Sequence, residues 1–220
     1  MADYATEEEQ LEALKRWWRE NGRSVLLGAA LGILALVGWR GWDMYREQQS
    51  LAASAIYDRI ESASGYEDAI ESVERLRADY ANTSYAVLGA LQAAGLAVGA
   101  GNLDAAVEWL EWAQANANSP AIAALARLRT ARVLFEQGDA ERALGLLDAE
   151  TPEAYTGLYA SLRGDILSER GDLEGALAAY QRSLDAEVGP VDRTLVERRI
   201  NRLRGQVSTG SGETTTDSDP

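Results

Sequence analysis

Apolar and polar positions divide the chain into one long apolar run and a series of shorter amphipathic stretches. Residues 24–39 read SVLLGAALGILALVGW and contain no charged side chain. Beyond residue 42, apolar residues recur at the three- to four-residue spacing of helices that bury one face. The pattern predicts an all-α protein, with one N-terminal membrane helix followed by packed helices.

The apolar run is slightly short for a bilayer. Its sixteen residues rise about 24 Å as a helix, against roughly 30 Å of hydrocarbon. Arginine can snorkel and tryptophan favours the interface, so flanking residues can supply the difference. These flanking residues are Trp17, Trp18, Arg23, Trp39, Arg40 and Trp42. We therefore predict a transmembrane signal anchor over residues 24–42.

Two other interpretations fit an apolar run of this length: a buried core helix and a cleavable signal peptide. The paired tryptophan and arginine flanks disfavour a core helix. For cleavage, the nearest pair of small residues is Ala53 and Ala55, which lies beyond several charged positions and far from the run. The anchor accounts for the pattern better than either alternative.

Basic residues near the span predict its orientation. Lys15, Arg16, Arg19 and Arg23 precede it, whereas Arg40 and Arg46 follow it closely. Residues 1–23 should therefore be a cytoplasmic leader and residues 43–205 a periplasmic domain.

Two further features belong to these N-terminal segments. Leu11, Leu14 and Trp18 recur at helical spacing and predict a short amphipathic helix in the leader. Within the span, Gly28 and Gly32 form a GxxxG pair, which either lets a partner helix approach closely or reflects how common glycine is in membrane helices.

Three matching corners reveal internal repeats. Gly101-Asn102, Gly138-Asp139 and Gly171-Asp172 begin the same motif, with glycines 37 and 33 residues apart, close to the tetratricopeptide (TPR) period of about 34. A glycine in the left-handed conformation ends one helix, and Asn or Asp caps the next. The repeats predict a TPR-like α-solenoid of about four helical hairpins.

The predicted packing positions agree with this register. Gly164 and Tyr180 should touch within the last hairpin, and the equivalent pairs are Ala94 with Leu110 and Ala131 with Leu147. Ala69 takes the small position of a degenerate first unit. A final helix with Val191, Leu195, Ile200 and Leu203 on one side should cap the stack. Residues 206–220, which are rich in Ser, Thr, Gly and acid, should form a disordered tail.

The first helix of each repeat lines the groove of such a solenoid, where partners commonly bind. The groove positions in the second and third repeats are Leu88, Leu91, Val98, Leu125, Leu128, Arg132 and Phe135. Those of the fourth repeat are Leu158, Ser161, Asp165 and Ser168. Either the groove binds a partner helix or an unfolded segment, or the superhelix or the N-terminal helix fills it. Trp109 and Trp112 likewise either anchor a partner or pack in the core.

Composition excludes several functions. The chain has no cysteine and no histidine, which removes thiolate chemistry, disulfides and most zinc sites. Its net charge of −14 disfavours nucleic acid as a partner. No phosphate-binding loop or catalytic pair of residues is recognisable. We expect a protein that is not an enzyme and needs no cofactor or metal.

The leader and the repeats also resemble a known family. YATEEEQLEALKRWWRENG (Tyr4 to Gly22), the span with its GxxxG and the following RGW are similar to the YfgM-type ancillary subunits of the Sec translocon. LRGDIL (Leu162 to Leu167) and the corner at Gly171-Asp172 extend the resemblance. It covers the chain except for the tail beyond Arg204.

The resemblance implies an inner-membrane protein beside the Sec channel that pairs with a membrane-anchored periplasmic chaperone, the parvulin-like prolyl isomerase PpiD. Together the two would help newly exported polypeptides reach periplasmic chaperones. It implies no catalytic residue and no cofactor. From the repeats alone, a membrane-anchored scaffold for another envelope machine, such as cell-wall synthesis or division, remains an alternative.

Overall fold

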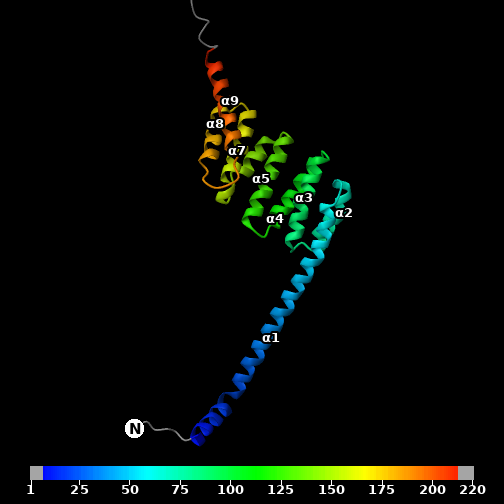
Figure 1. Cartoon of the computed structure of the whole chain (residues 1–220), viewed down its shortest axis with the longest axis vertical. Helices are drawn as coiled ribbons and strands as arrows, with labels where there is room; N and C mark the ends of the chain where they lie inside the picture. Colours follow the sequence, from blue (N-terminus) through cyan, green and yellow to red (C-terminus); the bar gives the residue numbers. More distant parts are fainter. Residues whose placement is uncertain (1–6, 213–220) are drawn as a thin grey trace, which may run out of the picture. The chain divides into compact units, whose positions relative to one another are not determined.

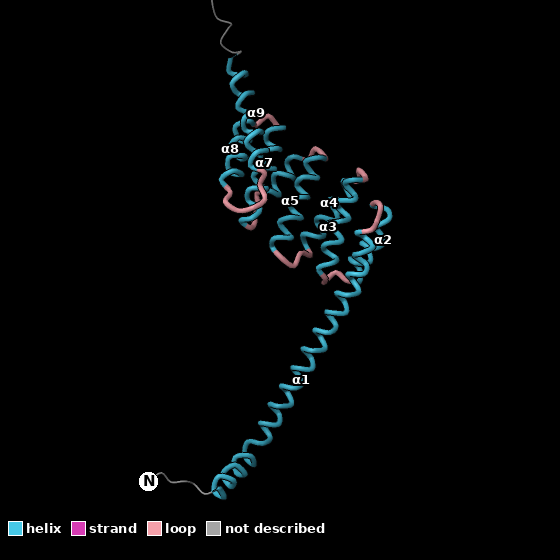
Figure 2. Tube along the Cα trace, viewed as in Figure 1, coloured by secondary structure: helices cyan, strands magenta, loops and turns pink. Residues whose placement is uncertain are grey.

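The computed structural model describes the backbone of residues 7–212 and the side chains of residues 10–206 apart from Ala13. Within that range every regular element is a helix (Figures 1 and 2). The helices are α1 (Glu7–Glu61), α2 (Tyr66–Asp79), α3 (Ser84–Gly99), α4 (Leu103–Ala115), α5 (Pro120–Glu136), α6 (Ala140–Leu147), α7 (Glu153–Glu169), α8 (Leu173–Asp185) and α9 (Arg193–Gly212). The all-α prediction is confirmed.

The chain divides between Leu51 and Ala52 into two units. The first unit contains the N-terminal part of α1, and the second contains its last turns and all later helices. α1 has no break between the apolar run and Glu61. The amphipathic leader helix is therefore the beginning of α1 rather than a separate element.

In the first unit, the apolar run is exposed along its length. Leu34 is 67% and Val37 64% exposed, and Trp39 and Trp42 are exposed as well. Among the described residues, α1 is the one helix long and apolar enough to cross a membrane. This exposure contradicts the core-helix interpretation, because a core helix would be largely buried.

The second unit is a stack of hairpins. The last turns of α1 with α2, then α3 with α4, α5 with α6 and α7 with α8 form the four pairs, and α9 packs on α8 (Figure 1). Ala53 and Ile60 are fully buried in the core shared with α2 and α3. Cleavage at the Ala53–Ala55 site would therefore cut a helix that the core holds, which favours an anchor over a signal peptide.

The three corners have the predicted geometry. Gly101, Gly138 and Gly171 have φ of 76°, 86° and 81°, the left-handed region that glycine adopts without a steric penalty. The residue after each glycine then caps the next helix: the side chains of Asn102, Asp139 and Asp172 accept hydrogen bonds from backbone N–H groups three residues on, at 3.2, 3.1 and 2.9 Å. The same local chemistry thus turns the chain three times.

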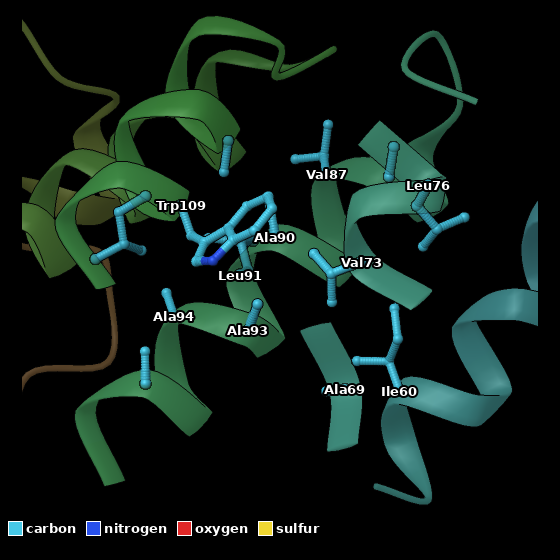
Figure 3. Close-up of a cluster of buried hydrophobic side chains, with 14 of the residues drawn as sticks. Ile60, Ala69, Val73, Leu76, Val87, Ala90, Leu91, Ala93, Ala94 and Trp109 are labelled. Carbon is cyan, nitrogen blue, oxygen red and sulfur yellow. The ribbon is translucent and has the colours of Figure 1, made fainter. Parts of the chain in front are cut away.

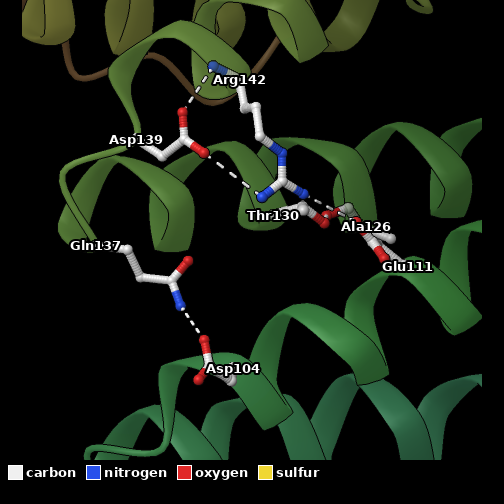
Figure 4. A network of polar contacts seen from close by, with 7 residues as sticks. All are labelled: Asp104, Glu111, Ala126, Thr130, Gln137, Asp139 and Arg142. Carbon is white, nitrogen blue, oxygen red and sulfur yellow. Dashed lines mark hydrogen bonds and ion pairs between the residues drawn. The ribbon is translucent and has the colours of Figure 1, made fainter.

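Polar contacts connect consecutive hairpins at these corners (Figure 4). The Gln137 amide donates to the carboxylate of Asp104 at 2.8 Å, and Arg142 forms ion pairs with Asp139 and with Glu111 at 3.5 and 3.7 Å. These side chains are largely exposed, so each ion pair contributes about 0–1 kcal/mol. Apolar packing must therefore provide most of the stability of the stack.

The C-terminal helix differs in detail from the prediction. Val196, Ile200 and Leu203 are the buried residues of α9, whereas Leu195 is 37% exposed. Val191 precedes the helix and packs against the same cluster, near Gly157. The predicted Ile200 and Leu203 are confirmed as buried, whereas Leu195 was wrong, because the neighbouring Val196 takes the buried position. α9 continues to Gly212, so residues 206–212 of the predicted tail are helical, and residues 213–220 lie outside the described range.

Candidate functional site: a two-part cleft on the first helices of the repeats

An open cleft lies between α3 and α5, the first helices of the second and third repeats. It has a volume of about 360 Å³. Its lining residues are Leu91, Gln92, Ala94, Gly95, Val98, Leu110, Arg129, Arg132, Val133 and Glu136. We call this the upper cleft. Its floor is apolar, and its charged side chains come from α5.

A second cleft of about 220 Å³ lies among α5, α7, α8 and α9. Its lining residues are Phe135, Asp165, Ser168, Glu169, Tyr180, Arg199, Arg202 and Leu203. We call this the lower cleft. Arg132 of the upper cleft lies close enough to Asp165 to lower its pKa, so the two clefts adjoin. Together they form one surface with an apolar end and a polar end.

The structure brings together four of the seven predicted groove residues. Leu91, Val98 and Arg132 line the upper cleft, and Phe135 lines the lower one. Leu88 is 39% exposed on α3, outside both clefts. Leu128 is buried in the core and Leu125 is half-buried, and neither lines a cleft. In the fourth repeat, Asp165 and Ser168 line the lower cleft, which agrees with its predicted polar character.

The two tryptophans of α4 pack inward. Trp109 is 2% exposed and its indole N–H donates to the Tyr66 hydroxyl at 3.0 Å. The guanidinium of Arg77 lies over the ring, 4.9 Å from its centroid. Trp112 is partly buried against the same core cluster, which Figure 3 shows around Trp109. Of the two interpretations left open, core packing is the one that the structure supports.

A half-buried polar group connects α7, α8 and α9. The Tyr180 hydroxyl of α8 donates to Asp165 Oδ1 of α7 at 2.7 Å, and Arg199 of α9 pairs with the same oxygen at 2.8 Å. Arg199 also donates to Ser161 Oγ at 3.3 Å. The sequence did not reveal this group, because it depends on a contact between helices that only the folded chain brings together. A signal was available in the arginines of α9, which lie beside its apolar positions.

Burial raises the pKa of Asp165, while the hydrogen bond from Tyr180 and the charges of Arg199 and Arg132 lower it only in part. The pKa of Tyr180 is also raised, mainly by burial and then by its contact with Asp165, so its hydroxyl stays protonated as a donor. The contacts of Asp165 with Tyr180 and Arg199 therefore hold α9 against α7 and α8, which is a structural role. Among the described residues no acidic cluster is arranged to hold a metal ion.

The raised pKa of Asp165 predicts a pH dependence of stability. Between the ordinary aspartate pKa of about 3.9 and the raised value, the folded state holds more protons than the unfolded state. The contribution of Asp165 to the free energy of unfolding therefore falls as pH rises through that window. Denaturant unfolding should measure the free energy of unfolding of the wild type minus that of Asp165→Asn. This quantity should fall as pH rises through that window and stay constant above it. A rise with pH would contradict the raised pKa.

Comparisons with known proteins place these features in a family. Residues 15–205 match the model of the tetratricopeptide repeat-like domain. The chain is 33% identical to the "Ancillary SecYEG translocon subunit" of Escherichia coli strain K12, over 92% of this chain and 99% of that protein. Proteins of the same name from Aggregatibacter actinomycetemcomitans and Neisseria gonorrhoeae are 30% and 26% identical, over 92% and 93% of this chain and the whole of each relative.

The matched region contains the apolar part of α1, the glycine corners and both clefts. One N-terminal apolar helix of membrane-spanning length, together with these relatives, indicates a single-pass protein of the inner membrane. On the family model and on the identity over nearly all of its length, the chain belongs to the family of ancillary SecYEG translocon subunits, the YfgM family of TPR-like proteins.

Proposed function

We propose that the chain is a non-enzymatic adaptor at the Sec translocon. It links the channel to a periplasmic, membrane-anchored chaperone of the prolyl isomerase type, PpiD, and helps newly exported polypeptides reach periplasmic chaperones. The main support is that similarity to translocon subunits extends through both the membrane helix and the repeats, over 92% of the chain. An adaptor needs both parts, one in the membrane and one outside it.

The two clefts are where this adaptor would hold a partner polypeptide. Both clefts are open, and first helices of the repeats, the surface that TPR-like stacks use for recruitment, form much of their lining. α8 and α9 form the rest of the lower cleft. Leu91, Val98, Arg132 and Phe135 lie there directly, and Leu88 is exposed on the same α3 helix. Leu128 supports α5 from within the core, and Leu125 is half-buried and lines neither cleft.

Cross-linking in intact membranes tests this function. A tagged full-length chain is cross-linked, purified gently, and its partners are identified by mass spectrometry. Recovery of channel subunits together with a periplasmic prolyl-isomerase-like chaperone supports the proposal. Recovery of cell-wall or division proteins without channel subunits contradicts it and favours an envelope scaffold.

The orientation of the anchor makes a separate prediction. Four basic residues precede the span and two follow closely, so the repeats should lie in the periplasm. Alkaline phosphatase is active only after export. A fusion after residue 205 should therefore be active, and a control fusion after residue 21 should be inactive. The opposite pattern would reverse the topology.

Gly28 and Gly32 should provide a packing face for a partner membrane helix. A Cβ added at either position meets no atom within 4 Å, so both are open to a neighbour. Gly28→Leu combined with Gly32→Leu should reduce cross-linking between the span and channel subunits by about tenfold or more, since leucines prevent close approach of backbones. Gly38→Leu is the matched control, because Gly38 is also open but lies on another face. Unchanged cross-linking in the double variant would exclude this packing face.

A further inference from the structure

The upper cleft combines an apolar floor with two arginines that form no ion pair with a described residue. Leu91, Val98, Leu110 and Val133 supply apolar surface, and Gly95 leaves the space above α3 free. At about 360 Å³, the cleft is at the small end of ligand pockets. It suits one or two large apolar side chains rather than a whole helix.

The arginines of the two clefts include three that form no ion pair with a described residue, as is also true of Arg59, Arg170 and Arg204 elsewhere in the repeat domain. Arg129 and Arg132 form no hydrogen bond or ion pair with any residue that the structure describes, and the same is true of Arg202 in the lower cleft. Arg77, Arg142 and Arg163, by contrast, pair with carboxylates on other helices. Arg132 lies near Asp165, but Asp165 is bonded to Arg199 and Tyr180, so none of the three guanidinium groups has a described carboxylate within ion-pairing distance.

The acidic residues of the upper cleft do not balance its arginines, because Glu136 faces both Arg129 and Arg132. In the lower cleft, Asp165 is engaged by Tyr180 and Arg199, and Glu169 balances Arg202. A guanidinium presents a planar fork of donors that fits a carboxylate in a bidentate manner. Guanidinium groups beside an apolar floor thus suit a partner that carries carboxylates next to an apolar side chain.

We propose that the two clefts bind an acidic polypeptide segment, with a large apolar side chain in the upper cleft and carboxylates on Arg129 and Arg132. The segment continues past Phe135 towards Arg202 in the lower cleft. This inference rests on the proposed adaptor function and specifies which polypeptides the adaptor selects. Basic segments are rejected by the same arginines that hold acidic ones.

Peptide binding to the full-length chain in detergent tests this selectivity. The probe is a fluorescent peptide with Leu-Phe at its centre and acidic residues on both sides, with matched peptides that carry serines or lysines in place of the acids. Fluorescence anisotropy should show the acidic peptide binding at least about tenfold more tightly than the serine peptide, and the lysine peptide more weakly still. Added salt should weaken binding of the acidic peptide.

Two sets of variants locate the site. Arg129→Glu with Arg132→Glu should weaken the acidic peptide at least about tenfold and favour the lysine peptide, while the control Arg75→Glu on α2 should have little effect. Gly95→Leu should block the upper cleft without disturbing the fold, because a Cβ there meets no atom within 4 Å. Gly145→Leu is its matched control on α6, equally open and outside both clefts.

Three results would overturn the inference: equal binding of the acidic and serine peptides, preference for the lysine peptide, or unchanged binding in Gly95→Leu. Circular dichroism and the unfolding midpoint of each variant show that a loss of binding is not a loss of fold. Recovery of channel subunits in cross-linked membranes does not depend on the peptide. A failure of this selectivity is therefore distinguishable from a failure of the adaptor function.

Discussion

Trp109→Ala should lower the free energy of unfolding of the repeat domain by about 3–5 kcal/mol, the usual loss for a large aromatic side chain in a core. The Trp109 side chain is 2% exposed and lies among residues of α2, α3 and α4 (Figure 3). Its removal would also leave the Tyr66 hydroxyl without its indole donor and Arg77 without the ring beneath it. The first two hairpins share this one side chain, so both should loosen.

Denaturant unfolding followed by circular dichroism measures this loss, since helix content does not depend on the number of tryptophans. Trp112→Ala is the matched control: it removes the same side chain one turn further along α4, where it is only partly buried. It should cost clearly less. Trp109→Phe should be intermediate, because it keeps most of the apolar volume and loses the N–H donor. If Trp112→Ala proved the more destabilising change, the assignment of Trp109 to the core would be wrong.

The repeat corners were predictable from the sequence because their cause is local. A glycine with positive φ followed by an Asx cap needs no information from elsewhere in the chain, and all three corners formed as expected. The apolar run was equally predictable, since its length and its lack of charged residues suffice to identify a candidate membrane span. The continuity of α1 to Glu61 agrees with the absence of proline from this part of the sequence.

The groove was only partly predictable, because α3 is apolar on almost every side and α5 carries apolar residues on more than one face. Periodicity then cannot tell a cleft-lining residue from a core residue. Leu128 and Val98 look alike in the sequence, yet Leu128 is 4% exposed in the core and Val98 is 37% exposed at the upper cleft. Arg129 was not predicted as a groove residue, because only the folded chain shows that it lines the upper cleft without an ion pair to a described residue.

The contact between Asp165, Tyr180 and Arg199 could not be derived from the sequence, because it joins three helices. Its existence also explains why α9 fits the end of the stack. The helix buries Val196, Ile200 and Leu203 and brings Arg199 to the half-buried carboxylate of Asp165. Apolar packing and charge thus favour the same register of α9, in which Val196 is buried in place of the predicted Leu195.

Gly164→Leu should be the other severe change, with a loss of about 3 kcal/mol or more from overpacking. A Cβ added at Gly164 would lie 2.5 Å from Cδ1 and Cε1 of Tyr180. The ring cannot retreat easily, because Tyr180 is 3% exposed and its hydroxyl is held by Asp165. Gly164→Ala should also destabilise, although a helical alanine returns up to about 1 kcal/mol. In Gly145→Ala, an added Cβ meets no atom within 4 Å, so the higher helix propensity of alanine should raise stability without any clash.

The other hairpins indicate how this loss can be rescued. Ala94 with Leu110 and Ala131 with Leu147 occupy the positions of Gly164 with Tyr180, and all four of these residues are buried. Gly164→Ala should therefore be neutral or stabilising in a Tyr180→Leu background, because that double variant recreates the alanine–leucine pair. A double-mutant cycle of unfolding free energies measures the coupling, expected at about 1–3 kcal/mol. Additive effects would mean that the ring of Tyr180 is not what demands glycine at position 164, and that the close approach of α7 and α8 has another cause.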